Sequence, residues 1–148
     1  MAGRFGRGVK ASIATGTSVK TLMQLVAAAN HAIKITEISI SFDGTNNTHE
    51  PILVEILRQT DAGTMTSLTL VKADDSIADS LDTTGQHTAT AEPTAGDILW
   101  AAKIHPQTGV VYPLGDGNPI AVGAGDRLGV RATAANDVDA AVVMAFEE

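Results

Sequence analysis

The clearest alternation of apolar and polar residues runs from Ile33 to Gly44 and predicts a long strand with one buried face. In the second half of this segment the apolar residues share one parity: Ile38, Ile40 and Phe42. Ile33 and Ile35 have the opposite parity, so the apolar phase slips by one residue near Thr36 and Glu37. A β-bulge at that point returns both halves to the same core, and we expect this strand to lie at the centre of the fold.

Further strand patterns follow on the C-terminal side. The run ILVEILRQT after Pro51 is apolar on both faces apart from Glu55, which is typical of a strand that is covered on both sides or lies near the centre of a sheet. A hairpin-length connection over residues 61–64 predicts that this strand pairs with the next one, over residues 65–71. The last strand, over residues 138–146, places alternate apolar residues on one buried face: Val138, Ala140, Val142, Met144 and Phe146.

The pattern A-G-D-x-L occurs at residues 95–99 and 124–128, and each copy is predicted to be a turn that leads into a strand. The first of these strands has one apolar face: Ile98, Trp100, Ala102 and Ile104. The second alternates in the same way: Leu128, Val130 and Ala132. Two shorter strands, over residues 110–114 and 119–122, are separated by residues 115–118, whose composition predicts a turn.

Two stretches have a mixed pattern. Residues 18–30 fit both a helical face and strand alternation, and we prefer a strand because they lead directly into the strand at Ile33. Residues 72–96 are small, acidic and rich in threonine, and predict a long functional or mobile connection with a short strand around residues 86–91.

Eight or nine short strands without a convincing long helix predict an all-β protein, an antiparallel β-sandwich of the jelly-roll kind. A chain of 148 residues suits one such domain, which we place at residues 18–148. Residues 1–17 contain four glycines and no sustained period, and are predicted to form a basic, extended and weakly ordered N-terminal arm.

The charged residues are distributed unevenly, and the change from basic to acidic lies close to the predicted boundary between the arm and the domain. The formal net charge is −7, yet the first twenty residues hold four basic and no acidic side chains, so the remainder carries −11. An acidic body disfavours general nucleic-acid binding, which needs clustered Lys and Arg. A basic arm on an acidic body favours contact with a partner or a neighbouring subunit, with a solvated terminus as the alternative. Five residues are candidates for that contact: Arg4, Phe5, Arg7, Lys10 and Ile13.

No arrangement of residues predicts a reaction. Cysteine is absent, the four histidines lack metal-site spacing, and the aspartates between residues 74 and 82 lack the pattern of a calcium loop. No serine lies in a G-x-S-x-G turn and no glycine-rich phosphate loop precedes a helix. We therefore expect no enzyme activity and no catalytic, cofactor-binding or metal-binding residues. Residues 1–9 lack the apolar segment of a signal peptide, so we expect a soluble protein that is not exported by a standard signal.

Five segments carry a resemblance: TSVKTLMQLVAAAN, IKITEISISFDGT, PILVEILRQTDAGT, QHTATAEPTAGDILW and GAGDRLGVRATAANDVDAAVVMAFEE. They cover nearly all of residues 18–148 and together resemble small auxiliary capsid proteins, the head decoration proteins, of tailed bacteriophages. The GDRLGV strand opening is also similar to that of trimeric jelly rolls of the tumour-necrosis-factor type.

The resemblance implies a structural virion protein that is made in the host cytoplasm and sits on the capsid surface as a homotrimer. Its partners would be the major capsid protein and other copies of itself, without membrane or direct nucleic-acid contact. Such proteins reinforce the shell by bridging capsomers, often through an ordered terminal arm. The alternative is a carbohydrate- or receptor-binding jelly roll, for which Trp100 and Tyr112 are the available stacking residues.

Overall fold

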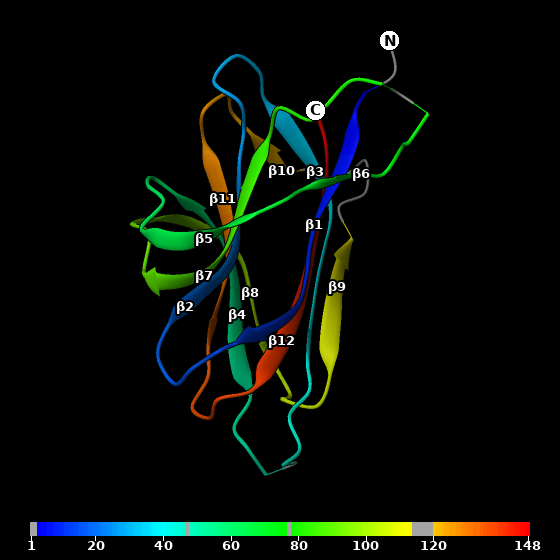
Figure 1. Ribbon diagram of the computed structural model, residues 1–148. Coiled ribbons are helices and arrows are strands. Elements are labelled where there is room, and N and C mark those ends of the chain that lie inside the picture. Colours follow the sequence, from blue (N-terminus) through cyan, green and yellow to red (C-terminus); the bar gives the residue numbers. More distant parts are fainter. Residues whose placement is uncertain (1–2, 47, 77, 114–119) are drawn as a thin grey trace.

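The computed structural model describes residues 3–46, 48–76, 78–113 and 120–148, which form two antiparallel β-sheets and no helix (Figure 1). In chain order the strands are β1 (Phe5–Ala14), β2 (Lys20–Val26), β3 (Ile33–Phe42), β4 (Ile52–Gln59), β5 (Thr64–Leu68), β6 (Val71–Lys72), β7 (Thr84–Ala91), β8 (Ala95–Ile104), β9 (Gly109–Pro113), β10 (Ile120–Val122), β11 (Arg127–Thr133) and β12 (Asp139–Glu147). Across these described ranges, then, no helix is long and apolar enough to cross a membrane. The predicted all-β class and the antiparallel β-sandwich are confirmed.

The two sheets are built from strands that are distant in the chain. Sheet A has the order β10-β3-β12-β1-β6, and β9 pairs with β3 next to β10. Sheet B has the order β5-β7-β2-β11-β4-β8. Figure 1 shows sheet A on the right and sheet B on the left, with both chain ends at the top. Because β3 lies between β12 and the β9 and β10 strands, its predicted central position is confirmed.

The phase slip in β3 is a β-bulge, as predicted. Ala145 of β12 pairs with Glu37, and the next residue, Phe146, pairs with Ile35, so Thr36 is the extra residue. All five apolar residues of β3 are consequently buried in one core: Ile33, Ile35, Ile38, Ile40 and Phe42.

The inner faces of the two sheets form a single hydrophobic core. Phe146 and Met144 of β12 are fully buried in it, as predicted, together with residues of β2 and β11 from the opposite sheet. β2 is a strand, so the helical alternative for residues 18–30 is wrong. Glu55, the one charged residue in the apolar run of β4, accepts a hydrogen bond at 2.9 Å from Nε of Arg131 on the adjacent β11.

The N-terminal residues form an integral strand, which corrects the prediction of a weakly ordered arm at residues 1–17. β1 pairs with β12 along most of its length and with β6 at Gly6 and Arg7. Two of its three buried positions are occupied by Gly6 and Gly8, so the alternation in the first half of the strand is hidden from a hydrophobicity pattern. A Cβ on Gly6 would lie 2.5 Å from Cζ of Phe146, which shows how closely the aromatic ring packs against β1.

The predicted hairpin between β4 and β5 is also wrong. Both edges of β4 are occupied, by β11 and β8, whereas β5 pairs with β7. The turn after β4 is held to the β7–β8 connection through Asp61. Its carboxylate accepts hydrogen bonds from the hydroxyl of Thr94 at 2.6 Å and from the backbone N–H groups of Thr94 and Gly63. These bonds, that of the Thr94 hydroxyl foremost, hold the pKa of Asp61 below its usual range.

The two copies of A-G-D-x-L differ in structure. The second is a turn before β11, with Gly125 at a φ of +77°, but the first already lies within β8. Ile98 is 50% exposed and does not share the inner face of β8. Ile56 pairs with Trp100 and Leu57 with Ile98, so Leu99 is an extra residue that turns Ile98 outward.

The single strand predicted over residues 65–71 is wrong, because that segment is divided between β5 and β6, which lie in different sheets. The three shorter strands predicted between residues 86 and 122 agree with the structure. The polar strand expected around residues 86–91 is β7, which lies between β2 and β5. The two short strands expected near residues 110 and 120 are β9 and β10, and the turn predicted between them lies outside the described residues.

Candidate functional site

The five residues predicted to contact a partner do not share one surface. Ile13 is buried in the core at 2% exposure, so its predicted contact role is wrong. Arg4 is engaged by acidic groups of the same chain. Lys10 pairs with a core position of β12 and lies near His87, whose pKa is lowered by burial and then by the charge of Lys10. Of the five, only Phe5 and Arg7 have exposed side chains, and strand register places both on the outer surface of sheet A.

Arg4 joins the beginning of the chain to the loop before β7 and to the end of β12. Its Nη2 atom lies 2.8 Å from Oδ2 of Asp82 and 3.4 Å from Oε1 of Glu148, and Nη1 donates to the carbonyl oxygen of Ser80. The backbones of Arg4 and Glu148 also exchange two hydrogen bonds. This group therefore clamps both ends of the described chain to the loop.

Glu148 is the centre of this clamp, and its side chain is fully buried. Its carboxylate accepts hydrogen bonds from the backbone N–H groups of Asp82 and Thr83, at 2.8 and 2.9 Å, and from the Thr83 hydroxyl. Burial alone raises the pKa of Glu148, but these bonds and the charge of Arg4 outweigh it. The pKa consequently lies below its usual range, and the carboxylate remains ionised in the folded protein.

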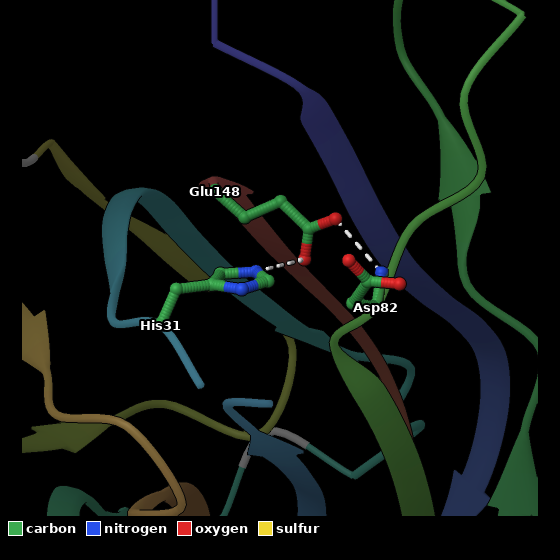
Figure 2. Close-up of side chains that lie close together, drawn as sticks. All are labelled: His31, Asp82 and Glu148. Carbon is green, nitrogen blue, oxygen red and sulfur yellow. Dashed lines mark hydrogen bonds and ion pairs between the residues drawn. The ribbon is translucent and has the colours of Figure 1, made fainter. Parts of the chain in front are cut away.

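His31, Asp82 and Glu148 form the one group of three possible metal ligands found among the described residues (Figure 2). Nε2 of His31 lies 3.7 Å from Oε2 of Glu148, and Nδ1 lies 3.0 Å from Oδ1 of Asn30. Both carboxylates already face the guanidinium of Arg4, which supplies the positive charge that a metal ion would bring. We therefore interpret the group as a structural clamp.

The outer face of sheet A, which we call the sheet A face, concentrates exposed apolar side chains. Seven large apolar side chains are exposed in the described chain, and strand register places four of them on this face: Phe5 (40% exposed), Val9 (48%), Val71 (51%) and Val111 (57%). The residues between them are small or only partly exposed: Ser39, Ser41, Ala141, Val143 and Ala145. The face thus combines exposed apolar side chains with small residues and a few charged ones, and a cluster of exposed apolar side chains is typical of an interaction surface.

Two opposite charges flank the middle of the sheet A face. Ala145 of β12 pairs with Arg7 of β1 on one side and with Glu37 of β3 on the other. Both charged side chains are exposed, and neither forms an ion pair within the part of the chain that the structure describes.

The outer face of sheet B instead carries a buried polar network. Nε2 of Gln24 donates to Oε1 of Gln59 at 2.7 Å, and Nε2 of Gln59 donates to the hydroxyl of Thr21 at 2.8 Å. Arg127 donates to Oε1 of Gln24 at 3.0 Å. A Cβ at Gly129 would overlap the Gln59 amide, so the glycine leaves room for the network. All three uncharged side chains are at most 5% exposed, which indicates a structural role.

The remaining candidate groups, an acidic loop, a surface hollow and an aromatic pair, lie apart and do not form one site. Asp74 accepts hydrogen bonds from the backbone N–H and hydroxyl of Ser76, a local turn rather than a calcium site. A surface hollow of about 490 Å³ lies beside β5 and β6, and Lys72 is the one ionisable side chain among its described lining residues. The rings of Trp100 and Tyr112 lie 5.0 Å apart and are both half-buried, so they pack against each other at the junction of β8 and β9.

The fold and these sites define an all-β sandwich protein with one exposed apolar sheet face. Comparisons with protein-family models, with curated proteins and with solved structures found no match to this chain.

The sequence did not indicate the clamp or the charge pair on the sheet A face. Arg4, His31, Asp82 and Glu148 are far apart in the chain, and their meeting depends on the pairing of β1 with β12. The buried network on sheet B could have been inferred from Gln24 and Gln59, because a glutamine inside an otherwise apolar strand must find a buried hydrogen-bond partner.

Proposed function

We propose that this chain is a structural protein of a tailed-phage virion, a decoration protein that binds the outside of the capsid shell as a homo-oligomer and stabilises it. The observation that carries the proposal is the sheet A face, where four of the seven exposed large apolar side chains gather. A protein without a partner gains nothing from exposing such a surface. The face therefore supports a protein whose role is to make contacts.

The residue chemistry is consistent with a role that is not enzymatic. Among the described residues, the charged groups that meet are held in ion pairs and hydrogen bonds that tie segments of the same chain. The acidic body supports a protein partner, the major capsid protein or another copy, rather than nucleic acid. In this proposal the protein is made in the host cytoplasm and resides on the virion surface.

The strand connections support a jelly roll as the particular form of the sandwich. Apart from β5, β6, β7 and β10, eight strands alternate between the sheets in the orders β1-β12-β3-β9 and β2-β11-β4-β8. The first half of the chain thus pairs with the second half in reverse order, as in a hairpin wrapped around the core. The segment between β4 and β8 is then an insertion at one end of the jelly roll.

A carbohydrate-binding jelly roll is supported less well. Stacking on a sugar needs an aromatic face open to solvent, and Trp100 and Tyr112 cover each other.

The proposal is tested by mixing the purified protein with shells from which it is missing and sedimenting the shells. We expect the protein to sediment with the shells and to raise the temperature at which they break. A protein that stays in the supernatant at saturating concentrations contradicts the proposal. Phe5→Ser is the informative variant, because Phe5 is exposed on the sheet A face, and Ile98→Ser on sheet B is its matched control.

A further inference from the structure

We propose that the sheet A face is the contact between two copies of this chain, packed face to face about a two-fold axis parallel to β12. The inference rests on the proposed function only in that this pair would be the homo-oligomer that decorates the shell. It assigns Phe5 and Arg7 to a subunit contact, so that both affect binding to the shell through the assembled pair.

Two charged residues of this face, Arg7 and Glu37, are placed so that two copies of the face are complementary to each other. Arg7 and Glu37 lie in one row of the sheet, each one strand away from Ala145, on opposite sides of β12. A rotation of 180° about an axis along β12 moves Arg7 of one copy over Glu37 of the other, and moves Glu37 over Arg7. One symmetric contact thereby forms two ion pairs from side chains that have no ionic partner in the described chain.

The same charges oppose a perpendicular axis over this row. An axis in the plane of the face, perpendicular to β12 and passing over Ala145, would place each Arg7 over Arg7 of the second copy and each Glu37 over Glu37. Like charges brought together in this way oppose association. The charge pattern therefore favours the axis parallel to β12, which forms both ion pairs.

The remaining positions on the face fit this axis. Val143 lies on β12 between Val9 and Ser39, so small and apolar residues meet along the centre of the contact. At one end of the face Phe5 would lie over Lys34 of the second copy, an arrangement that favours a cation–π contact. Glu147 lies near the axis in that row, where the positive charge of the adjacent Lys34 offsets the approach of the two carboxylates.

The size of the face is adequate for a stable pair. β1, β3 and β12 are nine or ten residues long, and with β9 they form a four-stranded surface. At about 3.3 Å per residue and about 4.8 Å per strand, this surface measures roughly 30 by 20 Å. That area is of the order of the ~800 Å² per partner that specific protein interfaces bury.

The test is a charge reversal read by sedimentation equilibrium. The wild-type protein is expected to be a dimer at micromolar concentration. Arg7→Glu and Glu37→Arg each turn both symmetric ion pairs into repulsive pairs, so each should raise the dimer dissociation constant by roughly tenfold or more. The double variant restores opposite charges with exchanged positions and should return the constant close to the wild-type value.

Lys103→Glu is the control, because Lys103 is exposed on sheet B, and it should leave the dimer unchanged. Circular dichroism on each variant checks that the sandwich has folded. A wild-type monomer or trimer, single reversals without effect, or a double variant as weak as either single variant would overturn the two-fold contact. A monomer that still decorates shells would leave the proposed function in place, whereas a dimer that fails to bind shells would remove that function and leave the contact.

Discussion

At the scale of single residues, a few polar side chains fix segments that no strand pairing joins. The Glu148 carboxylate holds the loop at Asp82 and Thr83 against the end of β12. Gln59 joins β4 to two residues of β2 through Gln24 and Thr21. Because these groups are buried, each contributes to stability mainly through the cost of leaving its partners without a hydrogen bond.

The clamp at Glu148 predicts a dependence of stability on pH. The folded-state pKa of Glu148 is lowered, so its stabilising contribution is fully present above the unfolded-state value of about 4.3 and is lost as the pH falls through the folded-state value. Glu148→Gln turns an amide N–H₂ toward the donors of Asp82 and Thr83 and should lower the urea midpoint at neutral pH. The difference from wild type should shrink as the pH falls below the unfolded-state value and through the lowered pKa of Glu148, because the wild-type carboxylate then becomes protonated as well.

Glu50→Gln is the control for this experiment, since Glu50 is exposed in the connection between β3 and β4, away from the clamp and the sheet A face. Equal midpoints for Glu148→Gln and wild type at neutral pH would show that the clamp contributes nothing to stability.

The buried network on sheet B predicts the effect of removing one amide. Gln59→Leu leaves Nε2 of Gln24 without its 2.7 Å acceptor and should lower the free energy of unfolding by about 1–3 kcal/mol. Gln107→Leu, at an exposed position, should change it by no more than about 0.5 kcal/mol. Chemical denaturation of both variants makes the comparison, and equal stabilities would mean that the network is dispensable.

At the scale of elements, β1 determines the organisation of sheet A. It lies between β12 and β6, and its outer residues supply Phe5, Arg7 and Val9 to the sheet A face. The strand is therefore needed both for folding and for the proposed contact. The charge pattern sets the basic N-terminal segment apart from the rest of the chain. In the structure, however, this segment is part of the sandwich.

Deletion of residues 2–17 should consequently prevent folding, in contrast to the folded body expected from the sequence. The deletion removes β1, exposes the edge of β12 and uncovers Phe146 and Met144 in the core. We expect the truncated protein to lack a cooperative thermal transition, whereas Arg7→Ser, which changes only an exposed side chain of β1, should keep one. A cooperative transition in the truncated protein at the wild-type temperature would contradict the assignment of β1 to the sheet.

Strands with alternating side chains were predictable from the sequence, including the bulge at Thr36, because one buried face imposes a period of two. β1 was not, because Gly6 and Gly8 occupy two of its three buried positions and carry no hydrophobic signal, which leaves Ile13 without an alternating pattern around it. Strand pairing could not be predicted from the sequence either. A short connection such as that at Asp61 favours a hairpin, but both edges of the preceding strand are already occupied by distant strands. The same limit applies to the site, because Arg7 and Glu37 meet only through the register of both strands with β12.

At the scale of the whole molecule, the two sheets share one core but have different outer faces. Sheet B buries a polar network on its outer side, whereas sheet A exposes four large apolar side chains. This asymmetry supports a protein with one surface for its partners, and in our proposal that surface joins two copies on a phage shell. The trimer implied by the resemblance is the competing prediction for the oligomer.

The proposed function is tested most directly by electron cryomicroscopy of phage particles assembled with the gene for this protein present, compared with particles from which the gene has been deleted. We expect additional density on the outside of the wild-type shell, into which the two-sheet sandwich fits with the sheet A faces of two copies against each other. Identical outer surfaces in the two kinds of particle would contradict the proposal that this chain decorates a capsid.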